Sequence, residues 1–150
     1  MVQLTDMDKD SSIKYFTLEE ANKTLPYVRR IVQDIAGEYQ EWRDCIFRHE
    51  VIAANSDAEE GETDEQVELR EEVDQIAQRI NRLIEELTDV GCIFKGFDAG
   101  LVDFHGRLDG RDIFFCWKLG EGEIAYWHER DGGFAGRQEL VPQLVNGETD

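Results

Sequence analysis

The sequence has little positive charge. Its 150 residues include 34 Asp and Glu but only 16 Lys and Arg, of which 5 are Lys, and the formal net charge is -18. Nucleic-acid phosphates are bound by basic surfaces that release counterions, so this composition argues against nucleic acid as a partner. Anionic membrane surfaces are disfavoured for the same reason. An excess of acids with few Lys predicts a halophilic protein, and general solubility is the alternative interpretation.

The sequence also lacks long apolar runs and paired cysteines. No apolar run approaches the roughly 20 residues that span a bilayer, and no apolar core of a signal peptide is present. We therefore expect a cytoplasmic protein with no membrane partner. The chain has three cysteines and no CxxC spacing, which argues against a disulfide framework or a zinc finger. Three buried thiols are predicted instead: Cys45, Cys92 and Cys116.

Motifs with a known catalytic mechanism are absent. The sequence contains no Walker loop, dinucleotide fingerprint, nucleophile elbow or HExxH string. It therefore names no reaction and no cofactor, and it leaves open whether the protein is an enzyme.

Helical periodicity marks the first part of the chain. Thr17 and Glu20 form a capping box, and apolar residues then recur in steps of three and four. Pro26 removes a backbone donor and disfavours helical geometry at the residue before it. The sequence therefore predicts a short helix near residues 18–24 and a long one over about 26–49.

A second helix follows an acidic connection. Thr63 and Gln66 form its capping box, its apolar stripe predicts a helix over 64–90, and Gly91 is placed to end it. Two such helices should pack as an antiparallel hairpin over residues 15–91. Because each stripe is narrow, a homodimeric four-helix bundle is an alternative use of these faces.

After the hairpin the apolar period changes to two. This alternation predicts strands near 101–107, 111–118 and 123–128. The Asp109-Gly110 pair is typical of a two-residue hairpin turn, which sets the register of the first two strands. That register places Asp103 opposite Cys116.

The whole pattern predicts an α+β fold, in which an antiparallel two-helix hairpin packs on a small antiparallel β-meander of three or four strands. One domain is expected over residues 15–140, with the hairpin at 15–91 and the meander with a glycine turn at 92–140. A flexible segment over 1–14 and a C-terminal tail over 141–150 flank it.

The register of the third strand determines which residues share a face. A four-residue loop from Leu119 to Gly122 predicts that Phe115 lies opposite Tyr126. One face is then apolar and covers the helices. The predicted outer face carries Asp103, His105, Phe114, Cys116, Ala125 and Trp127. Such a face is not typical of solvated surface, and it predicts either an interface or second core layer, or a ligand pocket.

His128 and Glu129 are candidates for a metal ligand and a general base, with Asp103, His105 or Cys116 as further ligands. Adjacent strand residues point to opposite faces, so His128 and Glu129 cannot both reach one ion in a regular strand. We predict instead that His128 is hydrogen-bonded at the sheet edge and that Glu129 pairs with Arg111 or Arg130. The sequence therefore assigns no metal ligand.

A glycine-rich segment precedes Arg137. Successive backbone N–H groups after Gly132, Gly133 and Gly136 can form an anion-binding nest, with the Arg137 guanidinium as a bidentate donor. The simpler interpretation, which we favour, is a sharp turn in which Phe134 fills the core and Arg137 forms a cap or an ion pair.

Several strings in the chain resemble a small prokaryotic family without assigned function, domain of unknown function twenty-two-oh-three. The matching strings are Phe16 to Asn22 with Leu25-Pro26, Gly100 to Phe104, Cys116 to Glu121, Trp127 to Glu129, and Gly133 to Arg137. The resemblance spans about residues 15–140 and implies no activity. The family places Pro where this chain has His105, and often Arg where it has Lys118. The matching chemical positions are Asp103, Cys116, Trp117, His128, Glu129 and Arg137.

These observations predict a small-ligand-binding or protein-interaction module that uses the outer face of the C-terminal sheet. A small anionic ligand, or a second copy bound through the helices or the outer face, is the expected partner. The alternative is a metal- or acid-base-dependent enzyme using Asp103, His128 and Glu129. The predicted ligand-binding residues are Asp103, Cys116, Trp127, His128, Glu129 and Arg137.

Overall fold

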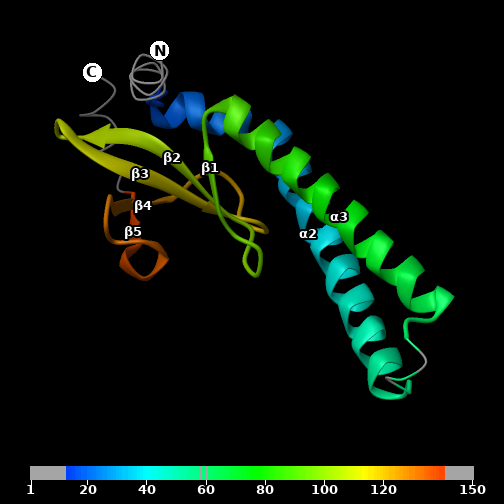
Figure 1. Ribbon diagram of the computed structural model, residues 1–150. Helices are drawn as coiled ribbons and strands as arrows, with labels where there is room; N and C mark the ends of the chain where they lie inside the picture. Colours follow the sequence, from blue (N-terminus) through cyan, green and yellow to red (C-terminus); the bar gives the residue numbers. More distant parts are fainter. Residues whose placement is uncertain (1–12, 58, 60, 141–150) are drawn as a thin grey trace, which may run out of the picture.

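The computed structural model describes residues 13–140 except 58 and 60. It has the predicted α+β fold, with a long helical hairpin beside an antiparallel sheet (Figure 1). The predicted C-terminal tail, 141–150, lies outside the described residues. So does the predicted flexible segment, 1–14, except for Ile13 and Lys14.

The first helix, α2 (Leu18–Ala54), is continuous, and the predicted break at Pro26 is wrong. The capping box of Thr17 is present as expected. The proline costs the helix about 3 kcal/mol. Buried side chains on both sides of it, including Leu25 and Val28, are held by the core, and this packing outweighs the local preference.

The second helix, α3 (Asp64–Val90), begins and ends where the sequence predicts. Thr63 and Gln66 form its capping box, and Gly91 ends it with a left-handed φ of 109°. Figure 1 shows the two helices running side by side, with their connection at the end far from the sheet. None of the described helices is long and apolar enough to cross a membrane.

Within the described residues, the sheet has five strands in the order of the chain, one more than the upper limit of the prediction. They are β1 (Ile93–Gly96), β2 (Leu101–Leu108), β3 (Arg111–Lys118), β4 (Tyr126–Glu129) and β5 (Gln138–Glu139). The two outer strands have only four and two residues, too few to produce a recognisable alternation.

The register of β2 and β3 is the predicted one. Asp109 and Gly110 form the connecting turn with positive φ angles of 54° and 77°, as a type I′ turn requires. Leu108 pairs with Arg111. Asp103 therefore lies directly opposite Cys116.

The register of β3 and β4 differs from the prediction by one residue. Phe115 pairs with Trp127 rather than with Tyr126. The connection is longer than four residues. Within it, the indole N–H of Trp117 donates to the Gly122 carbonyl at 2.9 Å, and the Ile124 N–H donates to Asn22 of α2 at 2.8 Å. A shift of one residue exchanges the two faces of a strand.

The core lies between the inner face of the sheet and the part of the hairpin next to it. Trp117, Phe104 and Phe115 are fully or almost fully buried there, together with Val28 and Val32 of α2. Trp127 is also on this inner face, so its predicted place on the outer face is wrong. The shift brings His128 to the outer face instead.

Candidate functional site

Three polar side chains from three adjacent strands meet on the outer face of the sheet. Asp103 of β2, Cys116 of β3 and His128 of β4 offer ligand atoms that all lie within 4.8 Å of one another. Their exposed fractions are 3%, 1% and 2%. Among the residues that the structure describes, no other group of three His, Cys, Asp or Glu side chains meets in this way.

Both ring nitrogens of His128 have defined partners. Nδ1 lies 2.7 Å from the backbone carbonyl oxygen of Glu129, and Nε2 lies 3.1 Å from each carboxylate oxygen of Asp103. Because a carbonyl oxygen only accepts, Nδ1 must carry a hydrogen. His128 is thus hydrogen-bonded as predicted, although β4 is the fourth strand of five and not the edge strand, and its Nε2 points at the Asp103 carboxylate.

The Cys116 thiol is in an environment that disfavours its ionised form. Burial raises the pKa of Cys116 to about 11, and the nearby Asp103 carboxylate contributes to this shift. All three cysteines are free and buried, as predicted. The Cys92 thiol donates to the Leu87 carbonyl at 3.4 Å, and burial raises its pKa to about 12.

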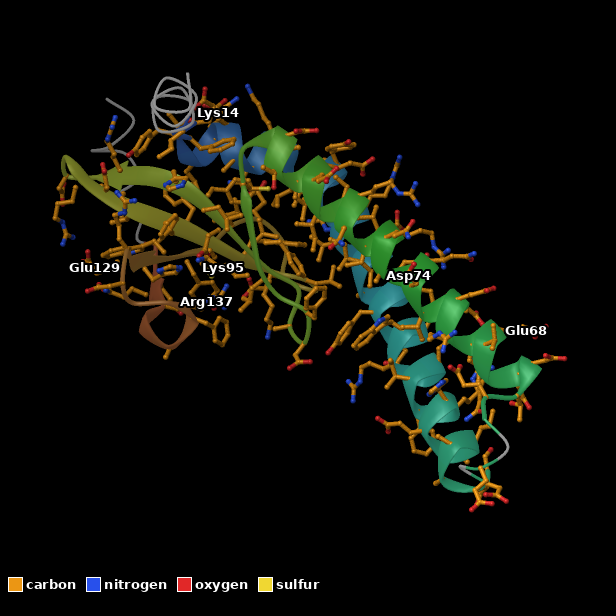
Figure 2. All side chains as sticks on the ribbon, in the orientation of Figure 1. Lys14, Glu68, Asp74, Lys95, Glu129 and Arg137 are labelled. Carbon is orange, nitrogen blue, oxygen red and sulfur yellow. The ribbon has the colours of Figure 1, made fainter. Side chains whose placement is uncertain are left out.

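A pocket of about 360 Å³ opens above these three side chains. Two cationic side chains stand at it, Lys95 of β1 and Arg130, each 5.9 Å from the ring centroid of Phe114. Figure 2 shows Lys95 on the sheet side of the molecule, away from α3. The lining is Lys95, Leu101, Asp103, Phe114, Cys116, His128, Arg130, Asp131, Gly133 and Phe134.

His105 shares this face but does not join the three. Its ring lies 5.7 Å from the ring centroid of Tyr15 and 4.8 Å from that of Phe114. Burial lowers the pKa of His105, and the Arg130 guanidinium adds to this effect. The residue therefore packs as an aromatic side chain.

Glu129 and Trp127 lie away from the pocket. Glu129 pairs with Arg111 at 2.8 Å, which is one of the two predicted pairings. Trp127 is 5% exposed on the core face. Arg130, the other predicted partner of Glu129, pairs with Asp112 at 3.3 Å.

Arg137 is part of a packed ion pair. Its guanidinium donates to both carboxylate oxygens of Glu121, at 2.6 and 2.8 Å, and lies 4.0 Å from the Tyr126 ring centroid. The side chain is 12% exposed, and its Nη2 also donates to the Cys116 carbonyl at 3.4 Å. Phe134 is 45% exposed, so the expectation that it fills the core is wrong.

The sequence placed Asp103 and Cys116 together but missed Lys95 and Arg130. The turn between β2 and β3 predicted the pairing of Asp103 with Cys116. Lys95, in contrast, lies on a four-residue strand with an irregular register. His128 was singled out by the string that contains it, and only the true register of β4 places it beside Asp103.

The chain belongs to a family described as "Uncharacterized conserved protein (DUF2203)", whose profile matches residues 14–140. This confirms the resemblance noted from the sequence strings. No curated protein and no solved structure matches the chain significantly.

Proposed function

We propose that this protein binds a small anionic ligand in the pocket on the outer face of its sheet. The observation that carries the proposal is the pocket itself, which has two cations, Lys95 and Arg130, over a buried polar floor. Its volume of about 360 Å³ lies within the range of about 300–1,000 Å³ typical of small-molecule sites. A small molecule fits such a concave site better than the surface of a partner protein would.

The two cations at the pocket suit a carboxylate or a phosphate. Lys95 has no carboxylate within ion-pair distance among the described residues, so its ammonium is available to a ligand. Arg130 offers further guanidinium donors beyond its exposed contact with Asp112. The lining also includes the carboxylates of Asp103 and Asp131, so the proposal rests on the available donors of Lys95 and Arg130 and not on a net positive charge of the pocket.

Binding of inorganic phosphate and of succinate, measured by isothermal titration calorimetry, tests the proposal. Lys95→Ala should weaken binding at least about tenfold, which corresponds to a loss of about 1.4 kcal/mol. Lys23→Ala is the matched control, because Lys23 is an exposed lysine on α2. Equal affinity of Lys95→Ala and wild type, or no binding of either probe to the wild type, would contradict the proposal.

The enzyme alternative uses Asp103, His128 and Glu129. The ion pair of Glu129 with Arg111 weighs against Glu129 as the base, since it directs the carboxylate away from the other two. Halophilic character, a cytoplasmic location and a homodimer through the helices or the outer sheet face stay predictions. In a reducing cytoplasm the Cys116 thiol would remain free.

A further inference from the structure

We infer that Asp103, Cys116 and His128 form a three-ligand site for a divalent transition-metal ion of borderline softness, of which zinc is the probe. The fourth coordination position would face the pocket, where the anionic ligand binds. The inference rests on the proposed function only for what occupies that fourth position.

The orientation of His128 is the first support. Because Nδ1 donates to the Glu129 carbonyl, a neutral His128 presents the bare lone pair of Nε2 to two carboxylate oxygens, each 3.1 Å away. Lone pairs in such an arrangement repel unless a positive charge lies between them. Histidines that bind metals commonly donate their other nitrogen to a carbonyl in this way.

The donor set is the second support. One thiolate, one imidazole and one carboxylate, with a fourth position left open, is a combination that zinc accepts. A tetrahedral ion with bonds of about 2.0–2.3 Å holds its ligand atoms about 3.3–3.6 Å apart. The observed atoms lie within 4.8 Å of one another, so modest side-chain rotations bring them to that spacing.

Burial is the third support. Asp103 and His128 are almost inaccessible to water yet line the pocket, so a metal there would have protein ligands on one side and the pocket on the other. Binding would replace the proton of the Cys116 thiol, which passes to the buffer as the sulfur–metal bond forms. A proton shared between His128 and Asp103 is the competing explanation of their contact.

The metal alone is the first probe. Chelator-treated protein is titrated with Co²⁺ and Zn²⁺, and bound metal is counted by elemental analysis. We expect one ion per chain and a thiolate-to-cobalt charge-transfer band. Cys116→Ala should abolish the band and weaken zinc binding at least about 100-fold, whereas Cys92→Ala, which removes a buried thiol outside the pocket, should leave both unchanged.

A measurement on the wild type does not depend on how the variants fold. X-ray absorption at the zinc edge should report one sulfur and otherwise nitrogen or oxygen ligands. No bound metal, no sulfur ligand, or an unchanged cobalt band in folded Cys116→Ala would overturn the inference and leave a proton between His128 and Asp103.

Anion binding separates this inference from the proposed function. Phosphate is titrated into metal-free and zinc-loaded wild type and Lys95→Ala. Zinc binding without any phosphate binding would contradict the proposed function and leave the metal site standing. Phosphate binding that depends on Lys95, in a protein that takes up no zinc, would support the proposed function and contradict the metal site.

Discussion

The helical hairpin and the sheet differ in what their charged residues contact. Residues 1–90 carry 23 acids and 10 bases, and residues 91–140 carry 9 and 6. On α3, Glu68 and Asp74 are exposed acids on the hairpin (Figure 2). In the sheet region, Asp103 and His128 are buried and contact each other. The charged pairs of the hairpin, such as Arg79–Glu38, are therefore partly or largely exposed to solvent, whereas the sheet also holds a contact between two buried polar side chains, Asp103 and His128.

This difference follows from how each region is covered. A helix in the hairpin buries one stripe and leaves the rest of its circumference to water. The sheet is packed on the helices by its inner face, and the segment after β4, including Gly133 and Phe134, lines the pocket on its outer face. Substitutions in the two regions should therefore have different effects.

The largest contrast is expected between two tryptophans. Trp117→Ala removes a fully buried ring from the sheet core and should lower the free energy of unfolding by about 3–5 kcal/mol. Trp42→Ala, on the partly buried face of α2, should cost about 1–2 kcal/mol. Urea unfolding of both variants measures the contrast, and equal losses would show that the distal hairpin is as tightly packed as the sheet.

Two ion pairs give the next contrast. Arg137→Ala leaves Glu121 without its partner in a largely buried place and should cost about 2–3 kcal/mol, somewhat below the range of about 3–5 kcal/mol for fully buried pairs. Arg79→Ala breaks the more exposed pair with Glu38 and should cost about 1 kcal/mol or less. A small loss for Arg137→Ala combined with lost phosphate binding would instead support its predicted role as a ligand-binding residue.

The same pair has a defined pH dependence. Burial tends to raise the pKa of Glu121, but bonds from Arg137 and from the Lys118 backbone N–H outweigh it, and the pKa lies below its ordinary 4.5. The pair's contribution is thus full above pH 4.5 and is lost as pH falls through the lower folded value. Glu121→Gln should be less stable than wild type at pH 7, and this difference should shrink below pH 4.5 in acid-dependent melting curves.

A Gly→Ala substitution should lower stability in the sheet and raise it in the hairpin. A Cβ at Gly106 of β2 would lie 2.4 Å from the ring of buried Phe115, so Gly106→Ala should destabilise by about 1–3 kcal/mol. Gly37 of α2 has nothing within 4 Å of that position, so Gly37→Ala should stabilise by about 0.5–1 kcal/mol. Chemical denaturation of both proteins tests the pair, and a neutral Gly106→Ala would mean that the Phe115 ring moves freely.

Salt should produce the smallest effects per residue. Repulsion among exposed acids extends about 10 Å at 0.1 M salt and about 3 Å at 1 M, so the melting temperature should rise between these concentrations. Glu68→Gln and Asp74→Asn should each change stability by about 0.5 kcal/mol or less and should reduce this salt dependence. A melting temperature that salt leaves unchanged would contradict the halophilic prediction.

Local sequence signals were sufficient for the start of α2, for both ends of α3 and for the first turn of the sheet. The capping boxes at Thr17 and Thr63, and Gly91 at the end of α3, act within one helical turn. The Asp109-Gly110 turn likewise sets its own strand register, which placed Asp103 opposite Cys116. Each of these features depends on residues close in sequence, so their chemistry can be recognised without the fold.

Tertiary structure decided the features that depend on distant contacts. The core holds α2 straight through Pro26 against its local preference. Asn22 of α2 binds the backbone at Ile124, within the longer connection that shifts β4 by one residue. That shift turns Trp127 into the core and His128 toward Asp103. The candidate site depends on this register. The contact of Asn22 with Ile124 joins residues 102 apart in the chain, and no local pattern encodes such a contact.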